Sequence, residues 1–184
     1  MSFCRRSYQF RWKKRLGVVA LLWLLRSGMG WAQGSDYRAQ SLFIYNFSKY
    51  ITWPDSAQTG DFVIGIYGNS PILRELEVMA ALKKAGNGRD IVVRPVDRLE
   101  QLQDLHLLYL TAAKSRELRD VLTTVGTHPI LILAERGGMA QKGADLNFIV
   151  MENATLKFEV NTQALKNHHL EIAPELLRIG FVVN

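Results

Sequence analysis

The stretch Phe62-Val63-Ile64-Gly65-Ile66-Tyr67, followed by Gly68-Asn69-Ser70-Pro71, decides the fold class of this chain. Nearly continuous apolar residues are typical of a strand buried on both faces, as found in parallel sheets that helices cover. The turn then leads into a segment whose apolar residues keep a helical period as far as Ala85. Ser70 can cap that helix, with Pro71 at its first position. We therefore expect a strand–turn–helix unit.

The same alternation recurs along the chain. An amphipathic helix is expected over residues 37–51, before the first strand. Further strands are expected where short apolar runs recur, at residues 91–93, 105–110 and 129–134. A helical turn at residues 99–103 and a helix that Ser115 caps and that continues to Val125 separate them.

The C-terminal part has a different pattern, because the strands expected at residues 147–151 and 156–160 follow each other around a short loop. Asn161 can cap a short helix, Pro174 opens another, and residues 181–183 can close the sheet. The whole pattern predicts an α/β fold: a three-layer sandwich with a mixed, mostly parallel sheet flanked by helices and a C-terminal antiparallel hairpin.

The first 32 residues have the pattern of a secretory signal. Six basic residues precede an apolar run over residues 16–25, and Gly30-Trp31-Ala32 ends the segment with small residues at the positions a signal peptidase requires. We expect residues 1–32 to be removed by cleavage between Ala32 and Gln33, leaving residues 33–184 as a single domain. A retained amphipathic anchor is the alternative; ten apolar residues are too few to span a membrane, which takes about 20.

Cleavage changes the charge and the cysteine content of the protein. The chain carries 23 Lys and Arg against 17 Asp and Glu, a net charge of +6, but seven of the basic residues lie before Ala32. The remaining domain is nearly neutral, so the electrostatic argument for nucleic acid as a partner fails. The only cysteine, Cys4, is also removed, and the domain then has no disulfide or thiolate ligand.

The domain shows no pattern that predicts catalysis, a cofactor or a metal site. No nucleophile–base motif, metal-ligating histidine pair or paired-carboxylate pattern is present in the sequence. His106 lies in an apolar strand and is expected to be a hydrogen-bonded core residue. The neighbours His168 and His169 point about 100° apart on a helix and are expected to face solvent.

The turn Gly68-Asn69-Ser70 is the strongest candidate for a small-ligand site. It joins the carboxyl end of a strand to the start of a helix, where free N–H groups favour an anion. An ordinary turn and helix cap is the alternative, since a phosphate loop has more glycines and a lysine, both missing here.

Tyr45 and Trp53 are candidates for a protein interface. The helix over residues 37–51, with the Trp53 that follows it, contains too many aromatic residues for one face. We expect Phe43, Phe47 and Tyr50 to enter the core and Tyr45 and Trp53 to stay partly exposed, which suits partner contacts. Ordinary packing against a loop is the alternative.

Several blocks of this sequence resemble the YfiR family. The run Tyr45-Asn46-Phe47-Ser48-Lys49-Tyr50-Ile51-Thr52-Trp53-Pro54 is similar to that family's opening helix, and Ile64–Pro71 to its first strand and turn. Further similar blocks follow in the family's order: 105–110, 130–135, 143–148, 156–161 and 170–179. Leu105 stands where many members have a cysteine, and Ala173-Pro174 replace a usual serine pair. The resemblance covers about residues 37–183.

The resemblance implies a periplasmic α/β sandwich protein, often a homodimer, without catalytic activity of its own. Similar family members repress an inner-membrane diguanylate cyclase by binding its periplasmic sensor domain, and an outer-membrane lipoprotein relieves the repression. Two other functions remain open. The first is that of a ligand-sensing partner of a membrane histidine kinase. The second is that of an enzyme that acts on phosphoesters or nucleotides at Gly68–Ser70.

Overall fold

The computed structural model describes residues 33–183, with side chains from Tyr37 onward. Residues 36–184 form one compact unit. The expected signal peptide, with Cys4 and Ala32, lies outside the described residues. Within residues 33–183, no helix is long and apolar enough to cross a membrane.

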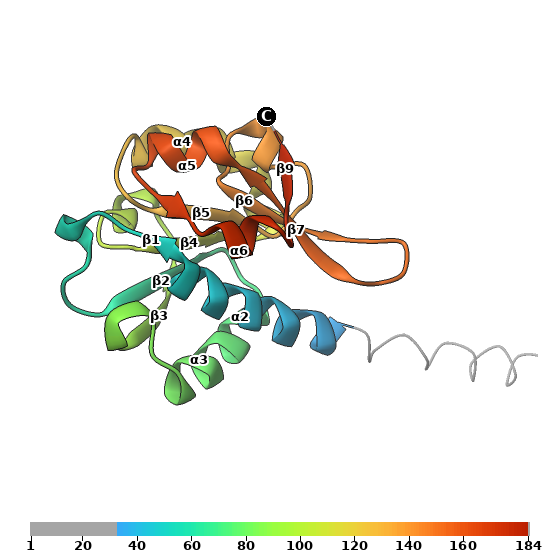
Figure 1. The fold of residues 1–184 in the computed structure, drawn as a ribbon, viewed down its shortest axis with the longest axis horizontal. Coiled ribbons are helices and arrows are strands. Elements are labelled where there is room, and N and C mark those ends of the chain that lie inside the picture. Colours follow the sequence, from blue (N-terminus) through green and yellow to red (C-terminus); the bar gives the residue numbers. More distant parts are fainter. Residues whose placement is uncertain (1–32, 184) are drawn as a thin grey trace, which may run out of the picture. The chain divides into compact units, whose positions relative to one another are not determined.

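A seven-stranded sheet forms the centre of this unit (Figure 1). The strands lie in the order β3-β2-β4-β5-β6-β7-β9. The first five are parallel, β7 is antiparallel to β6, and β9 runs parallel to β7. Their bounds are β2 Phe62–Tyr67, β3 Ile91–Val96, β4 Leu107–Leu110, β5 Leu131–Ala134, β6 Leu146–Val150, β7 Leu156–Asn161 and β9 Phe181–Val183.

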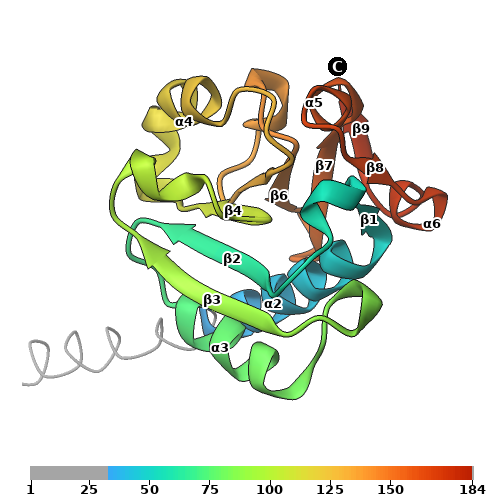
Figure 2. The ribbon, with the colours of Figure 1, turned by 90° about the vertical axis from the view of Figure 1, so that its left-hand side faces the viewer.

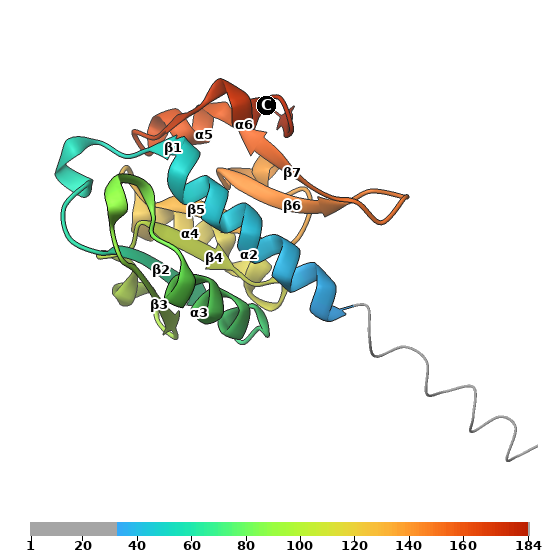
Figure 3. The same cartoon turned by 60° about the horizontal axis from the view of Figure 1, so that its bottom comes forward.

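Helices cover both faces of the sheet, which confirms the three-layer sandwich. Helices α2 (Gln33–Tyr50) and α3 (Ile72–Leu82) pack on one face, and α4 (Leu118–Val125) packs on the other (Figure 2). Figure 3 shows α2 and α3 side by side on their face. Each face has its own apolar core, because the continuous apolar strands send alternate side chains to opposite sides.

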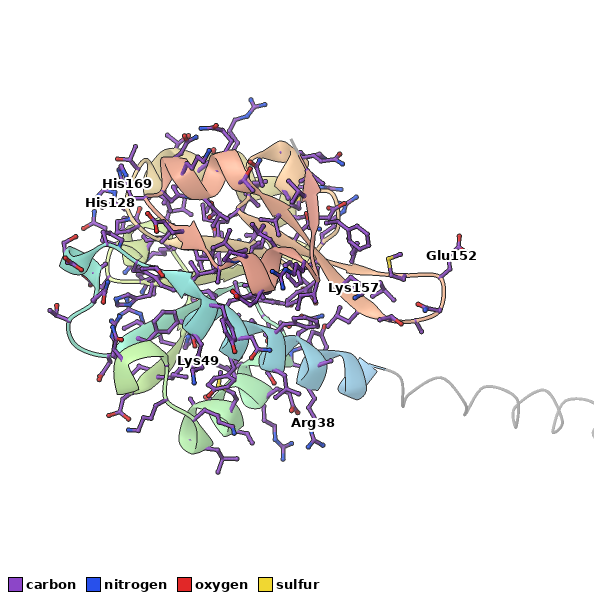
Figure 4. The ribbon with its side chains drawn as sticks, viewed as in Figure 1. Arg38, Lys49, His128, Glu152, Lys157 and His169 are labelled. Carbon is purple, nitrogen blue, oxygen red and sulfur yellow. The ribbon has the colours of Figure 1, made fainter. Side chains whose placement is uncertain are left out.

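The C-terminal hairpin is confirmed, with Phe148 of β6 opposite Phe158 of β7. Its tip, with Glu152, projects beyond the rest of the sheet (Figure 4). Short helices α5 (Thr162–Asn167) and α6 (Pro174–Leu177) follow, and Pro174 opens α6 as expected. Asn161 caps α5 as predicted, since its Oδ1 accepts a hydrogen bond from the Ala164 N–H at 2.9 Å.

The helical turn expected at residues 99–103 is a 3₁₀ helix, Leu99–Leu102, and two further 3₁₀ helices lie at Gly86–Gly88 and Ala112–Glu117. Two more lie at Asp55–Ala57 and Ala140–Lys142. The expected cap at Ser115 is wrong, because its hydroxyl donates to the Ala112 carbonyl at 2.8 Å inside the 3₁₀ helix that leads into α4. Ser70 also misses the cap position by one residue, since Pro71 takes it and α3 begins at Ile72.

A second, two-stranded sheet was not expected. Strand β1 (Ile51–Thr52) pairs antiparallel with β8 (Glu171–Ile172) directly after α2 ends. Helix α2 therefore stops one residue before its expected end. This pairing fixes the C-terminal segment to the end of α2, and the Ala173 N–H extends it by donating to the Tyr50 carbonyl at 2.9 Å.

The core of α2 differs from the expected one at a single aromatic residue. Phe47 is fully buried and Phe43 packs against the same core, as predicted. Tyr50 is 47% exposed, so its expected burial is wrong. Ile44 takes the inner position instead, because it shares one helical stripe with Phe47 at a spacing of three residues.

Candidate functional site

The turn Gly68-Asn69-Ser70 lies where the connections of the parallel sheet change sides. The connection from β2 to β3 passes over the α3 face, whereas the one from β3 to β4 passes over the α4 face. In sheets of this kind ligands bind beyond the carboxyl ends of the strands at such a point. A hollow of about 410 Å³ lies here, and the turn lines it together with Pro95, Asp97 and Lys114.

The backbone conformation of Gly68 explains why this position is a glycine. Its φ is +99°, and a Cβ atom there would lie 2.3 Å from Thr111 Oγ1. Thr111 is fixed in turn, because its hydroxyl donates to the Tyr67 carbonyl at 2.9 Å. The close approach of Gly68, which follows β2, to Thr111, which follows β4, therefore joins the ends of these two strands. Ser70 is buried, and its Oγ lies 3.4 Å from the Ile72 N–H, as in a turn that precedes a helix.

The cation nearest this turn already has a partner. Lys114 Nζ donates to Glu117 Oε1 at 2.8 Å and lies 4.8 Å from the centre of the Tyr67 ring. The Tyr67 hydroxyl also donates to Glu117. These hydrogen bonds lower the pKa of Glu117, and the bond to Glu117 raises the pKa of Lys114. Since Glu117 and the lining Asp97 offset the lysine charge, the hollow has little preference for an anion.

The two predicted interface aromatics differ in exposure. Trp53 is only 5% exposed, its ring packs edge-on against Phe62 at 5.0 Å, and its Nε1–H donates to the His106 carbonyl at 3.2 Å. The expected exposure of Trp53 is therefore wrong, since β1 carries the chain back over the sheet. Tyr45 is half-buried, with the ammonium groups of Lys49 and Lys83 at 5.6 and 5.7 Å from its ring centre (Lys49 is labelled in Figure 4).

His106 is hydrogen-bonded through both ring nitrogens, as predicted, but it is only half-buried and lies directly before β4. Nδ1 accepts from the Val63 N–H at 3.1 Å, and Nε2 lies 3.0 Å from the Ala57 carbonyl. The neutral ring therefore carries its proton on Nε2. Burial and the adjacent Arg89 guanidinium lower the pKa of His106, against the opposing effect of the Ala57 carbonyl.

Arg89 organises the loop before β2, a role that the sequence did not reveal. Its guanidinium donates hydrogen bonds of 2.8–3.3 Å to four backbone carbonyls of that loop. The acceptors are the carbonyls of Ala57, Thr59, Gly60 and Asp61. It also stacks over the Phe62 ring at 5.7 Å. These bonds use most of its donors, so Arg89 holds the loop rather than a ligand.

Asp145 and His168 form a buried pair that no local pattern in the sequence indicates. Asp145 is 0% exposed and His168 is 3% exposed, so the expectation that His168 faces solvent is wrong. Burial raises the pKa of Asp145, and the hydrogen bond at 2.8 Å to His168 Nδ1 opposes this effect. The Ile132 N–H donates to the same carboxyl at 2.7 Å. His169 is exposed, so the two histidines diverge as predicted.

His168, held by Asp145, also lines a hollow on the surface of the domain. The residues around the hollow beside His168 include no Ser, Thr or Cys: they are Leu122, Gly126, Gly143, Asn161, Gln163, Ala164, Asn167 and His168. Within residues 33–183, no group of His, Cys, Asp and Glu side chains is placed to hold a metal ion. The hydrogen bond between Asp145 and His168 links the start of β6 to the end of α5.

The architecture and these sites define an α/β sandwich protein whose buried polar groups mainly join its own elements. The chain belongs to the YfiR/HmsC-like family, whose model matches residues 37–180. The resemblance noted in the sequence is thereby confirmed over nearly the whole domain. No curated protein matches the chain. Membership supports a regulatory protein of the periplasm that acts in diguanylate cyclase signalling.

Proposed function

We propose that this protein is a non-enzymatic periplasmic repressor of an inner-membrane diguanylate cyclase. It acts by binding the periplasmic sensor domain of the cyclase and so lowers cyclic-di-GMP and biofilm formation. The observation that carries the proposal is the match of residues 37–180 to the YfiR/HmsC-like family. An outer-membrane lipoprotein that sequesters the repressor, and a homodimeric state, are parts of the same proposal.

The side-chain chemistry supports binding over catalysis. The Asp145–His168 pair lacks an adjacent nucleophile, and Lys114 at the Gly68–Ser70 turn is engaged with Glu117. A general base acts within hydrogen-bond reach of a substrate, and the basic side chain that lines the turn, Lys114, is held by Glu117. This argument disfavours the alternative of an enzyme acting at the turn.

Tyr45 is the residue that we propose for contact with the cyclase. Its half-buried ring lies between two lysines, so it combines apolar area with positive charge at one place on α2. Aromatic residues held in this way are frequent energetic centres of protein interfaces. Tyr50, exposed on the same helix without such neighbours, is a matched control.

The test is a deletion with complementation. Deleting the gene is expected to raise cellular cyclic-di-GMP, and the intact gene is expected to restore it. Tyr45→Ala is expected to restore repression poorly, with partner affinity lowered roughly tenfold, whereas Tyr50→Ala restores it fully. Cyclic-di-GMP is measured by mass spectrometry. Binding is measured as the amount of cyclase that each purified variant captures from solubilised inner membranes.

Unchanged cyclic-di-GMP in a strain that expresses the neighbouring cyclase would contradict the proposed function. A change confined to a histidine kinase response would favour the ligand-sensing alternative. If repression is confirmed but both tyrosine variants repress equally well, the function stands and Tyr45 is not at the interface.

A further inference from the structure

A second hollow, distinct from the Gly68–Ser70 turn, lies beside α4. It has a volume of about 680 Å³ and lies between the start of α4 and the connection from β5 to β6. We call it the basic hollow; its lining consists of Ser115, Arg116, Leu118, Arg119, Asp120, Leu122, Arg136, Met139 and Lys142. Such a volume lies within the range of about 300–1,000 Å³ that small-molecule sites occupy.

The charge of this hollow is unusual for a nearly neutral domain. Four of the 16 Lys and Arg residues that follow Ala32 line it, namely Arg116, Arg119, Arg136 and Lys142, against the single carboxylate of Asp120. All four basic side chains are exposed. Four cations around one hollow repel each other, and an anion bound among them relieves this repulsion.

Within residues 33–183, none of these four side chains takes part in an ion pair. In the part of the chain that the structure describes, the ion pairs join Lys84 with Asp90, Lys114 with Glu117 and His168 with Asp145. Arg116, Arg119, Arg136 and Lys142 make no side-chain hydrogen bond there. Their donors are therefore free to bind a ligand, in contrast to Lys114 and Arg89.

The walls and the position of the hollow narrow the class of ligand. Arg116 and Arg119 follow β4 and Arg136 follows β5, so they lie beyond the carboxyl ends of two parallel strands, where α/β proteins bind ligands. Three of the four cations are arginines, whose planar forks fit phosphate oxygens. Leu118 and Met139, both 4% exposed, add an apolar wall for the rest of the molecule.

We propose that the basic hollow binds a phosphate-bearing anion through Arg116, Arg119, Arg136 and Lys142. A soluble phosphate ester and the headgroup of an anionic phospholipid share this chemistry, and the experiment separates the two sources. The proposal does not depend on the regulation of a cyclase, because the test measures binding by the purified protein alone.

The test uses the protein expressed from its full gene and purified from the periplasm. Glycerol 3-phosphate and pyrophosphate are titrated by calorimetry, and vesicles of phosphatidylglycerol or phosphatidylcholine are tested by co-sedimentation. The variant Arg119→Gln/Arg136→Gln removes two of the four cations. Its matched control, Arg74→Gln/Lys166→Gln, removes the same charge from exposed positions outside the lining of the hollow.

Binding of either phosphate probe, or of phosphatidylglycerol over phosphatidylcholine, is expected for the wild type and the control. In the Arg119→Gln/Arg136→Gln variant it is expected to weaken about 100-fold, since each charged hydrogen-bonding group contributes roughly tenfold. Equal weakening in both variants would overturn the proposal, as would the absence of binding to every phosphate probe. Binding of an acidic peptide in place of the phosphates would overturn it as well.

Discussion

His106 gives this domain a predictable dependence of stability on pH. Its pKa is lowered in the folded state by burial and by Arg89, so the unfolded chain binds a proton more readily than the folded one. The stability that its neutral form supplies is complete above the unfolded pKa of about 6.5. That stability is lost as the pH falls from there through the lower pKa of the folded protein.

The prediction is tested by urea unfolding of the wild type and His106→Gln at about pH 7.5 and about pH 5. The wild type is expected to be the more stable protein at the higher pH, because Nδ1 accepts the Val63 N–H and Nε2–H donates to Ala57. This advantage is expected to shrink at the lower pH. His169→Gln, at an exposed position, is the control. If the stability difference between the wild type and His169→Gln changed with pH as much as that for His106→Gln, the role of His106 would be contradicted.

At the residue scale, the sequence predicts features that depend on neighbours in the chain, such as turns. It does not predict contacts or burial that depend on residues far away in the chain. The turn at Gly68 follows from a strand that ends before a helical period, and the structure confirms it. Lys114 approaches Gly68 from 46 positions further along the chain, which no local pattern shows. The burial of His168 has the same origin, because its partner Asp145 lies 23 residues away.

At the scale of elements, length decides what can be predicted. Strand β2 has six nearly continuous apolar residues, and α2 has eighteen residues that repeat a helical period, so both can be recognised in the sequence. Strands β1 and β8 have two residues each and no period at all. Their pairing, Ile51 with Ile172, depends on the fold bringing both ends of the domain together.

The packing of α2 on the sheet is expected to depend on Phe47. Its ring lies 5.1 Å from that of Phe158 and 6.2 Å from that of Phe148, so the helix is packed against the C-terminal hairpin. Phe47→Ala is expected to lower the free energy of unfolding by about 3–5 kcal/mol, because it leaves a cavity in a close-packed core. Urea unfolding followed by circular dichroism measures the loss.

Leu42 provides a control on the same helix, since it is 52% exposed. Leu42→Ala is expected to change the free energy of unfolding by no more than about 0.5 kcal/mol. If Phe47→Ala does not fold, Phe47→Leu keeps most of the buried volume and is expected to give a smaller loss in the same direction. Equal stability of the Phe47→Leu and Leu42→Ala proteins would show that the aromatic cluster does not hold α2.

For the whole molecule, the distribution of charge is more informative than its sum. The net charge of +6 comes from the basic residues before Ala32, whereas the domain beyond is nearly neutral and gathers four basic side chains at one hollow. A protein that kept residues 1–32 would carry two separate basic regions, the N-terminal segment and the basic hollow. Removing the first leaves the basic hollow as the main positive feature that a phosphate-bearing partner meets.

Cleavage between Ala32 and Gln33 is therefore the prediction with the widest consequence. N-terminal sequencing of the periplasmic product is expected to begin at Gln33-Gly34-Ser35. Signal peptidase needs a small residue immediately before the cut and tolerates variation one position earlier. Ala32→Arg is thus expected to accumulate uncleaved precursor at the membrane, whereas Trp31→Leu is processed normally. A mature protein that begins at Met1 would instead favour a retained anchor, and the exported domain would then act while attached to the inner membrane.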